Sequence, residues 1–108
     1  RNGGKITRPF LGVAMLDATD FYNLSRYKIT LPEGTEGAVV IEVQEKSPAS
    51  NAKLKMGDVI TKIDDYEVKS VSQLKYYLYK HEPGETVKVK VMRGSKSKDF
   101  DVKLGQSE

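Results

Sequence analysis

Cysteine is absent from this 108-residue sequence, and histidine occurs once, as His81. The lack of cysteine excludes disulfide bridges, cysteine-ligated zinc and thiol catalysis. A Ser-His-Asp triad would have to use His81, and no Gly-x-Ser-x-Gly pattern positions a serine nucleophile. Neither His-Glu-x-x-His nor the phosphate-binding Gly-x-x-x-x-Gly-Lys-Ser/Thr pattern is present. These absences favour a binding module over an enzyme, and we expect no metal and no cofactor.

The chain has no large excess of charge of one sign, because it contains 18 lysines and arginines and 15 aspartates and glutamates. The two signs are interspersed, whereas a nucleic-acid-binding domain usually concentrates its basic residues in a patch or stripe. No apolar run approaches the ~18 residues of a membrane-spanning helix, and no secretory signal segment is seen. We therefore expect neither a nucleic-acid partner nor direct membrane insertion.

Length and composition are those of one small globular domain. With 38% hydrophobic and 31% charged residues, the chain can bury a modest core. A Gly-Gly pair among the charged residues of 1–8 predicts a linker there. We interpret the start at Arg1 as that of a fragment, with an upstream protease domain absent, the domain itself at 9–105 and a tail at 106–108.

Short strands are predicted wherever residues alternate or are β-branched. The first is expected from about Gly12, because Leu11, Val13 and Met15 then share one face. The other strands are expected at 38–43, 59–63, 66–68, 86–92 and 100–104.

One main helix and two short helices are predicted between these strands. The clearest helical spacing runs over 70–80, and a helix of one to two turns is expected at 47–52. A further short helix is expected within 17–28, capped by Asp17 or Thr19. The elements predict an α+β domain, a five- to six-stranded, partly open antiparallel barrel or sandwich capped by the main helix.

Several of these segments, in this order, resemble PDZ domains. Residues 10–13, Phe-Leu-Gly-Val, look like the carboxylate-binding loop, and residues 47–64 resemble the S-P-A…L-K-x-G-D-V-I…I-D run of bacterial members. Residues 70–87 resemble their groove helix and the strand that follows it. Residues 3–13 are similar to the junction between the protease and PDZ domains of the HtrA/Do family of trypsin-like serine endopeptidases. The resemblance covers about 4–104 and implies a PDZ-like fold.

Two features depart from compact PDZ domains. Lys53 stands where the family commonly has glycine, so we expect that turn to be altered or less strained. Residues 17–36 form a longer segment than in compact PDZ domains, and an insertion at this place is usual in the HtrA family.

The resemblance implies a groove that binds a peptide C-terminus by adding the peptide to the sheet as a strand. The backbone amides of Leu11, Gly12 and Val13 would bind the carboxylate, because successive N–H groups in a turn form an anion-binding nest. Gly12 lacks a Cβ, which lets the loop curl and the carboxylate approach. The groove would be lined by Phe10, Ala14, Met15, Val71, Lys75 and Leu78.

Each of these roles has a simpler alternative. The pattern alone favours a core role for Leu11, Val13 and Leu78, since most apolar strand and helix positions are buried. Lys75 is more typical of a solvated helix residue than of a specificity residue, and Arg8 is equally a linker charge or an aid to carboxylate binding through water. At the start of the helix, an apolar Val71 predicts a preference for an apolar third-last peptide residue.

The sequence thus predicts a non-catalytic PDZ domain of an HtrA-type serine protease. It would bind C-terminal peptides or unfolded proteins with apolar ends, and would regulate the upstream protease domain. The resemblance further implies a bacterial, extracytoplasmic parent, anchored to the cell membrane by an N-terminal segment, that acts in protein quality control and the stress response.

Three alternatives stay open at this point. The domain could come from an intramembrane metalloprotease or a C-terminal processing peptidase, which carry PDZ domains of the same type. It could act as an oligomerisation or interaction surface with an occluded groove, which burial of Leu78 under residues 17–36 would favour. A nucleic-acid-binding domain would show affinity that falls steeply with salt.

Overall fold

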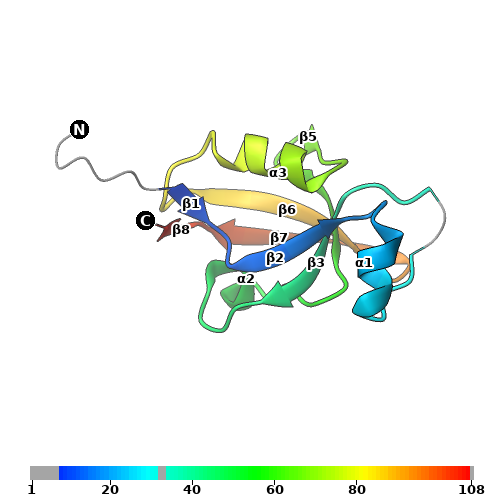
Figure 1. Ribbon diagram of the computed structural model, residues 1–108. Helices are drawn as coiled ribbons and strands as arrows, with labels where there is room; N and C mark the ends of the chain where they lie inside the picture. Colours follow the sequence, from blue (N-terminus) through cyan, green and yellow to red (C-terminus); the bar gives the residue numbers. More distant parts are fainter. Residues whose placement is uncertain (1–7, 32–33, 108) are drawn as a thin grey trace.

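The chain forms one antiparallel sheet of six strands with helices on its faces (Figure 1). The computed structural model describes residues 8–31 and 34–107, of which 8–10 and 106–107 are described by their backbone alone. The strand order β2-β3-β4-β6-β7 places β2 and β7 at the edges, and β5 pairs with β4. This confirms the predicted α+β class and open antiparallel sheet. The strands are β2 (Val13–Asp17), β3 (Ala38–Val43), β4 (Val59–Ile63), β5 (Tyr66–Glu67), β6 (Thr86–Arg93) and β7 (Lys96–Lys103).

The main helix, α3 (Val71–Leu78), begins where the sequence predicts. The Ser70 hydroxyl caps it by accepting the N–H of Gln73 at 3.1 Å. The Gln73 side chain in turn accepts the N–H of Lys69 at 2.8 Å. The first bond satisfies a backbone donor that a helix start leaves unpaired, and the second ties the residue before the cap to the first turn of α3.

The two short helices are α1 (Phe21–Arg26) and α2 (Pro48–Asn51). Ser47 caps α2 as expected, with its hydroxyl accepting the N–H of Ser50 at 3.1 Å. The cap of α1 is Asp20, whose carboxylate accepts the N–H of Asn23, so the prediction of Asp17 or Thr19 was wrong. The helix starts later than expected because a backbone turn, from Asp20 N–H to the carbonyl of Asp17, precedes it.

Two apolar clusters lie on opposite faces of the sheet. Neighbouring residues of β3 join different clusters, Val40 the larger and Val39 the smaller, because successive strand side chains point to opposite faces. The larger, main cluster is covered by α3 through Leu74 and Leu78. The smaller, second cluster consists of Ala18, Leu24, Val39 and Val59, packed against Leu16, Ile29, Leu31, Ile41 and Met92.

A separate two-stranded sheet joins the two ends of the described chain. Strand β1 (Arg8–Phe10) pairs with β8 (Gly105–Ser107), with Arg8 opposite Ser107. Arg8, the last residue of the predicted linker, and residues 106–107 of the predicted tail therefore take part in a ladder. Local sequence pattern does not reveal a pairing between segments so far apart in the chain.

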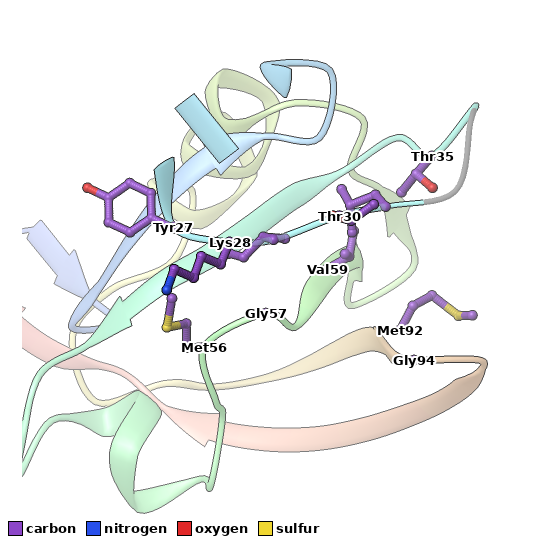
Figure 2. Close-up of a pocket in the computed structure, with 11 residues that line it drawn as sticks. Tyr27, Lys28, Thr30, Thr35, Met56, Gly57, Val59, Met92 and Gly94 are labelled. Carbon is purple, nitrogen blue, oxygen red and sulfur yellow. The ribbon is translucent and has the colours of Figure 1, made fainter. Parts of the chain in front are cut away.

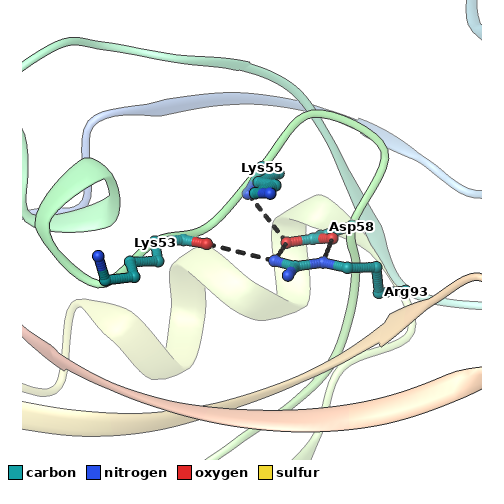
Figure 3. Close-up of polar contacts among 4 residues, drawn as sticks. All are labelled: Lys53, Lys55, Asp58 and Arg93. Atoms are coloured by element: carbon teal, nitrogen blue, oxygen red, sulfur yellow. Dashed lines mark hydrogen bonds and ion pairs between the residues drawn. The ribbon is translucent and has the colours of Figure 1, made fainter.

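The turn before β4 is held by an ion pair between a buried carboxylate, Asp58, and a partly exposed arginine, Arg93 (Figure 3). Arg93 binds both carboxylate oxygens of Asp58, through Nε at 2.8 Å and Nη2 at 2.8 Å, and Asp58 is only 1% exposed. The same carboxylate accepts the N–H of Lys55, while Nη2 of Arg93 also donates to the Lys53 carbonyl. The bonds to Asp58 raise the pKa of Arg93 above its usual value. Two parallel bonds of this kind give both strength and a defined geometry.

Lys53 adopts a left-handed backbone conformation, with φ of 72°. This is the region that favours glycine, and it costs other L-residues roughly 1–2 kcal/mol. The prediction that lysine makes this turn altered or less strained was therefore wrong. Its carbonyl bond to Arg93 and its N–H bond to the Ser50 carbonyl hold it in place.

Candidate functional site

Strand β2 lies at one edge of the described sheet, with β3 on its inner side. An edge strand presents a row of N–H and C=O groups to which another strand can be added. Val13 and Met15 pack against the main cluster, whereas the side chain of Ala14 is exposed. Ala14 is therefore exposed between two partly buried residues of β2, and its place in a groove stays a prediction.

The loop before β2 turns its carbonyls toward residues 44–49. The Leu11 carbonyl accepts the N–H of Ala49 at 2.9 Å, and the Gly12 carbonyl accepts the N–H of Gln44 at 2.8 Å. In a planar trans peptide the N–H points opposite to the C=O. The amides of Gly12 and Val13 consequently point away from residues 44–49. Gly12 has φ of 86°, which glycine adopts without strain, and this conformation lets the loop present two successive donors.

The helix α3 lies beside β2 with a defined direction. The carboxylate of Asp17, the last residue of β2, accepts the N–H of Val71, the first residue of α3, at 2.7 Å. From this contact α3 runs opposite to β2, as Figure 1 shows. The end of α3 at Leu78 therefore lies on the side of Gly12, and its start lies on the side of Asp17. Sequence reasoning missed this role of Asp17, because nothing local links it to a residue 54 positions away.

The predicted apolar lining divides into buried and partly exposed residues. Leu11 and Leu78 are only 3% and 5% exposed and belong to the main cluster, so both serve the core. Met15 and Val71 are partly buried at its margin. Lys75 is exposed on α3. The structure brings these residues to adjoining elements, and their part in ligand binding stays a prediction.

Two predicted site residues, Arg8 and Phe10, are described by their backbone alone. Arg8 and Phe10 belong to β1 by their backbone, and the description does not extend to their side chains. The proposed assistance of Arg8 to a carboxylate, and the place of the Phe10 ring in a groove, stay predictions.

The described part of residues 17–36 does not pack with Leu78. Its buried residues, Ala18 and Leu24, belong to the second cluster, whereas Leu78 belongs to the main cluster. The 17–36 segment reaches α3 through the carboxylate of Asp17. This arrangement gives no support to a groove covered by that segment.

His81 follows α3 and bridges two carboxylates. Its Nε2 lies 2.9 Å from an oxygen of Asp64, and its Nδ1 lies 2.8 Å from an oxygen of Glu85. The hydrogen bond from His81 is the largest cause that lowers the pKa of Glu85, and a backbone bond adds to it. The contacts tie the segment after α3 to the β4–β5 turn, so His81 has a structural role at this end of the helix.

The part of the chain that the structure describes contains no group of three or more His, Cys, Asp or Glu placed to hold a metal ion. Within the same residues, no helix combines the length and apolar character that crossing a membrane requires.

An open antiparallel sheet, a glycine loop before its edge strand and a helix alongside define a small α+β binding module. The chain belongs to the PDZ domain family, whose sequence model matches residues 9–104. It is 44% identical over 105 residues to the "Serine protease Do-like HtrA" of Lactococcus lactis subsp. lactis, and 36% identical over 115 residues to that of Bacillus subtilis. These matches cover 96% and 97% of the chain but 26% and 24% of the relatives, so the chain spans about a quarter of their length.

Solved structures agree with this assignment. The chain superposes on "HtrA-type protease AlgW with tripeptide" with a TM-score of 0.77 and 25% identity, over 99% of this chain and 34% of that one. The HtrA3 PDZ domain bound to a phage-derived ligand matches with a TM-score of 0.75, over 94% of this chain and 89% of that one. At 22% identity, the second match shows the fold alone.

Proposed function

We propose that this domain binds the free C-terminus of a peptide by adding it as a strand to the open edge of β2. The observation that carries this proposal is the orientation of the Gly12 and Val13 amides, which point away from residues 44–49 at the start of an edge strand. A carboxylate loses its water on binding and needs replacement donors, which two aligned amides supply. The AlgW structure to which the chain is similar contains a tripeptide, in agreement with the proposal.

The position of the Gly12 loop at the start of β2 sets the expected direction of the peptide, and the contact between Asp17 and Val71 places α3 beside it. With its carboxylate at Gly12, the peptide runs antiparallel to β2 and lies along α3. Its last side chain then points toward Val13 and Leu78. Two residues, or ~7 Å of strand, separate the last residue from the third-last, which places that residue beside Met15 and Val71.

The proposed specificity depends on the apolar residues that would flank the third-last peptide residue, one from β2 and one from α3. Met15 and Val71 are hydrophobic and offer no partner to a peptide hydroxyl, so an apolar third-last residue is favoured. Lys75 is exposed on the same helix and would attract an acidic residue or the carboxylate itself. Arg8 would add a water-mediated contact to that carboxylate.

Titration of C-terminal peptide libraries into the isotope-labelled chain tests the proposal, with amide shifts followed by NMR. Peptides with apolar ends should bind with dissociation constants on the order of 1–100 μM, because few residues are buried and the peptide must be ordered. Shifts should centre on Leu11, Gly12, Val13 and Leu78. Each ligand is repeated as its C-terminal amide, and equal binding of the amidated peptide would contradict carboxylate capture.

Replacement of Val71 by histidine tests the specificity separately. Val71→His should shift the preference at the third-last position from apolar residues toward serine or threonine, because an imidazole offers their hydroxyl a partner. Ser72→His, one position along on the exposed surface of α3, is the matched control and should leave the preference unchanged. An unchanged preference in Val71→His would remove the role assigned to this residue.

The relatives indicate a wider context for the chain. We infer that it forms part of an HtrA-type serine endopeptidase whose catalytic residues lie in another domain, and that peptide binding delivers substrates to that domain or regulates it. Among the similar proteins is a "Probable periplasmic serine endoprotease DegP-like" of Rickettsia prowazekii, 30% identical over 104 residues. An extracytoplasmic place, a membrane-anchored parent and a role in protein quality control under stress are part of this proposal.

A second candidate is an interaction surface whose groove stays closed. The deep burial of Leu11 and Leu78 favours it, since side chains only 3% and 5% exposed present little surface to a ligand. In that case the peptides would leave the amides of Gly12 and Val13 unshifted, and Leu78→Ala would destabilise the fold without changing peptide binding.

A further inference from the structure

A cavity of about 480 Å³ lies on the face of the sheet that carries the second cluster. Figure 2 shows it between the segment that precedes β3, the turn before β4, and the strand β6 with its following turn. Its apolar lining comes from Ile29, Leu31, Met56, Val59 and Met92. This volume is within the ~300–1,000 Å³ of pockets that bind small ligands.

The cavity has one cationic end. In Figure 2 the side chain of Lys28 extends to the end near Met56, while Thr35 and Gly94 mark the other end. The eleven lining residues include no aspartate or glutamate. The adjoining cavity, which shares Tyr27 with this one, is lined by a second cation, Arg26. An elongated apolar space with positive charge at one end matches a chain that is apolar along its length and anionic at one end.

We propose that this cavity binds a medium-chain fatty acid, with the acyl chain along the apolar lining and the carboxylate at Lys28. Burial of the acyl chain removes apolar surface from water and so favours binding. The ammonium group adds a charge-assisted contact at the open end. A peptide fits this lining less well, because its backbone N–H and C=O groups would be desolvated against side chains that are mostly apolar.

Two methionines make the cavity adaptable to such a chain. Met56 is 51% exposed and Met92 is partly buried, and the unbranched, polarisable methionine side chain adjusts to irregular apolar partners. The site does not depend on the proposed peptide groove, because α3 packs on the main cluster at the other face. Failure of either proposal leaves the other intact.

The three methionines of the chain provide the test. In the full 108-residue chain with ¹³C-labelled methionine methyl groups, sodium decanoate is titrated below its micelle concentration. The methyl signals of Met56 and Met92 should shift and saturate, whereas that of Met15 in β2 should not. Decyltrimethylammonium, which has the same chain and the opposite charge, should bind at least several-fold more weakly than decanoate.

Reversal of the charge at Lys28 tests the carboxylate contact. Lys28→Glu should raise the dissociation constant of decanoate about fivefold, as expected for loss of an exposed charge contact, and should leave that of decanol unchanged. Lys46→Glu is the matched control, because Lys46 is also exposed and has the same φ of 60°. It should have no effect on decanoate.

Four results would overturn the proposal: no saturable shift of Met56 and Met92, shifts of Met15 with decanoate, equal binding of the cationic probe, or equal effects of the two lysine variants. If C-terminal peptides shift Met56 and Met92 and decanoate does not, the cavity is a peptide site instead.

Discussion

The carboxylate of Asp17 accepts the backbone N–H of Val71 at 2.7 Å, across 54 residues of sequence. The bond joins the end of the edge strand to the start of the helix beside it. It satisfies one of the N–H groups that the first turn of a helix leaves without a partner, and it places negative charge at the positive end of the helix dipole. One side chain thus fixes how the two walls of the proposed groove lie relative to each other.

Removal of this carboxylate should destabilise the domain. We expect Asp17→Ala to lower the free energy of unfolding by about 1–2 kcal/mol, because the Val71 N–H loses a charged acceptor. Asp17→Asn keeps an acceptor oxygen and should cost less. Urea denaturation followed by circular dichroism measures both. Asp20→Ala, which removes only the local cap of α1, is the comparison, and only Asp17→Ala should also weaken peptide binding.

The pair of buried Asp58 and partly exposed Arg93 should be strongly coupled. Arg93→Ala leaves the buried Asp58 carboxylate without its counterion, so we expect it to cost about 2–4 kcal/mol. Asp58→Ala leaves a cation that is already 29% exposed, and it should cost less. The double variant should cost clearly less than the two single losses combined. Additive losses in the urea midpoints would show that the pair makes no specific contribution. Lys96→Ala, on the exposed surface of β7, is the neutral control.

Gly37 should not tolerate a side chain. Its φ is +137°, and a Cβ built on it would lie 2.5 Å from the backbone oxygen of Ile60. Gly37→Ala should therefore destabilise the domain by about 3 kcal/mol or more, through backbone strain and a clash with a central strand. Gly34 also has positive φ, +87°, but among the described residues no atom lies within 4 Å of a built Cβ. Gly34→Ala should cost about 1 kcal/mol, and equal thermal shifts in the two variants would contradict the clash.

His81 should control the titration of Glu85. The hydrogen bond from His81 lowers the pKa of Glu85 from its ordinary 4.5, so this contact stabilises the folded chain above that pH. The contribution is lost as the pH falls through the lowered pKa. His81→Ala should move the pKa of Glu85 back up, as read from its side-chain carboxyl signal by NMR. Lys80→Ala is the control, and an unchanged pKa in His81→Ala would mean that the bond is not formed in solution.

The local sequence pattern predicted a helix or strand well where the residues that define it lie close together in the sequence. Ser70 and Ser47 cap α3 and α2 as expected, because a cap is formed by residues three positions apart. The strand expected at 100–104 begins earlier, at Lys96, since the charged residues of β7 pair with β6 although they lack an apolar face. Cross-strand hydrogen bonds, rather than the pattern of β7 itself, determine where that strand starts.

Prediction of the site was less complete. The loop of Leu11, Gly12 and Val13 was predicted as a carboxylate site from its residues and their resemblance to a family, and that role stays a prediction. Two hydrogen bonds, from the N–H groups of Gln44 and Ala49 to the loop carbonyls, turn the amides of Gly12 and Val13 outward. These donors are more than thirty residues away in the sequence. No pattern within residues 10–13 contains that information.

The amino-acid sequence alone determined the class of the domain, the helix and strand alternation, and the absence of thiol and Cys-zinc chemistry, because these depend on composition and on neighbours within a few residues. The tertiary structure decided the burial of Leu11 and Leu78, the direction of α3 against β2, and the apolar cavity on the opposite face. Each of these depends on contacts between distant segments, and such contacts form only when the sheet brings those segments together.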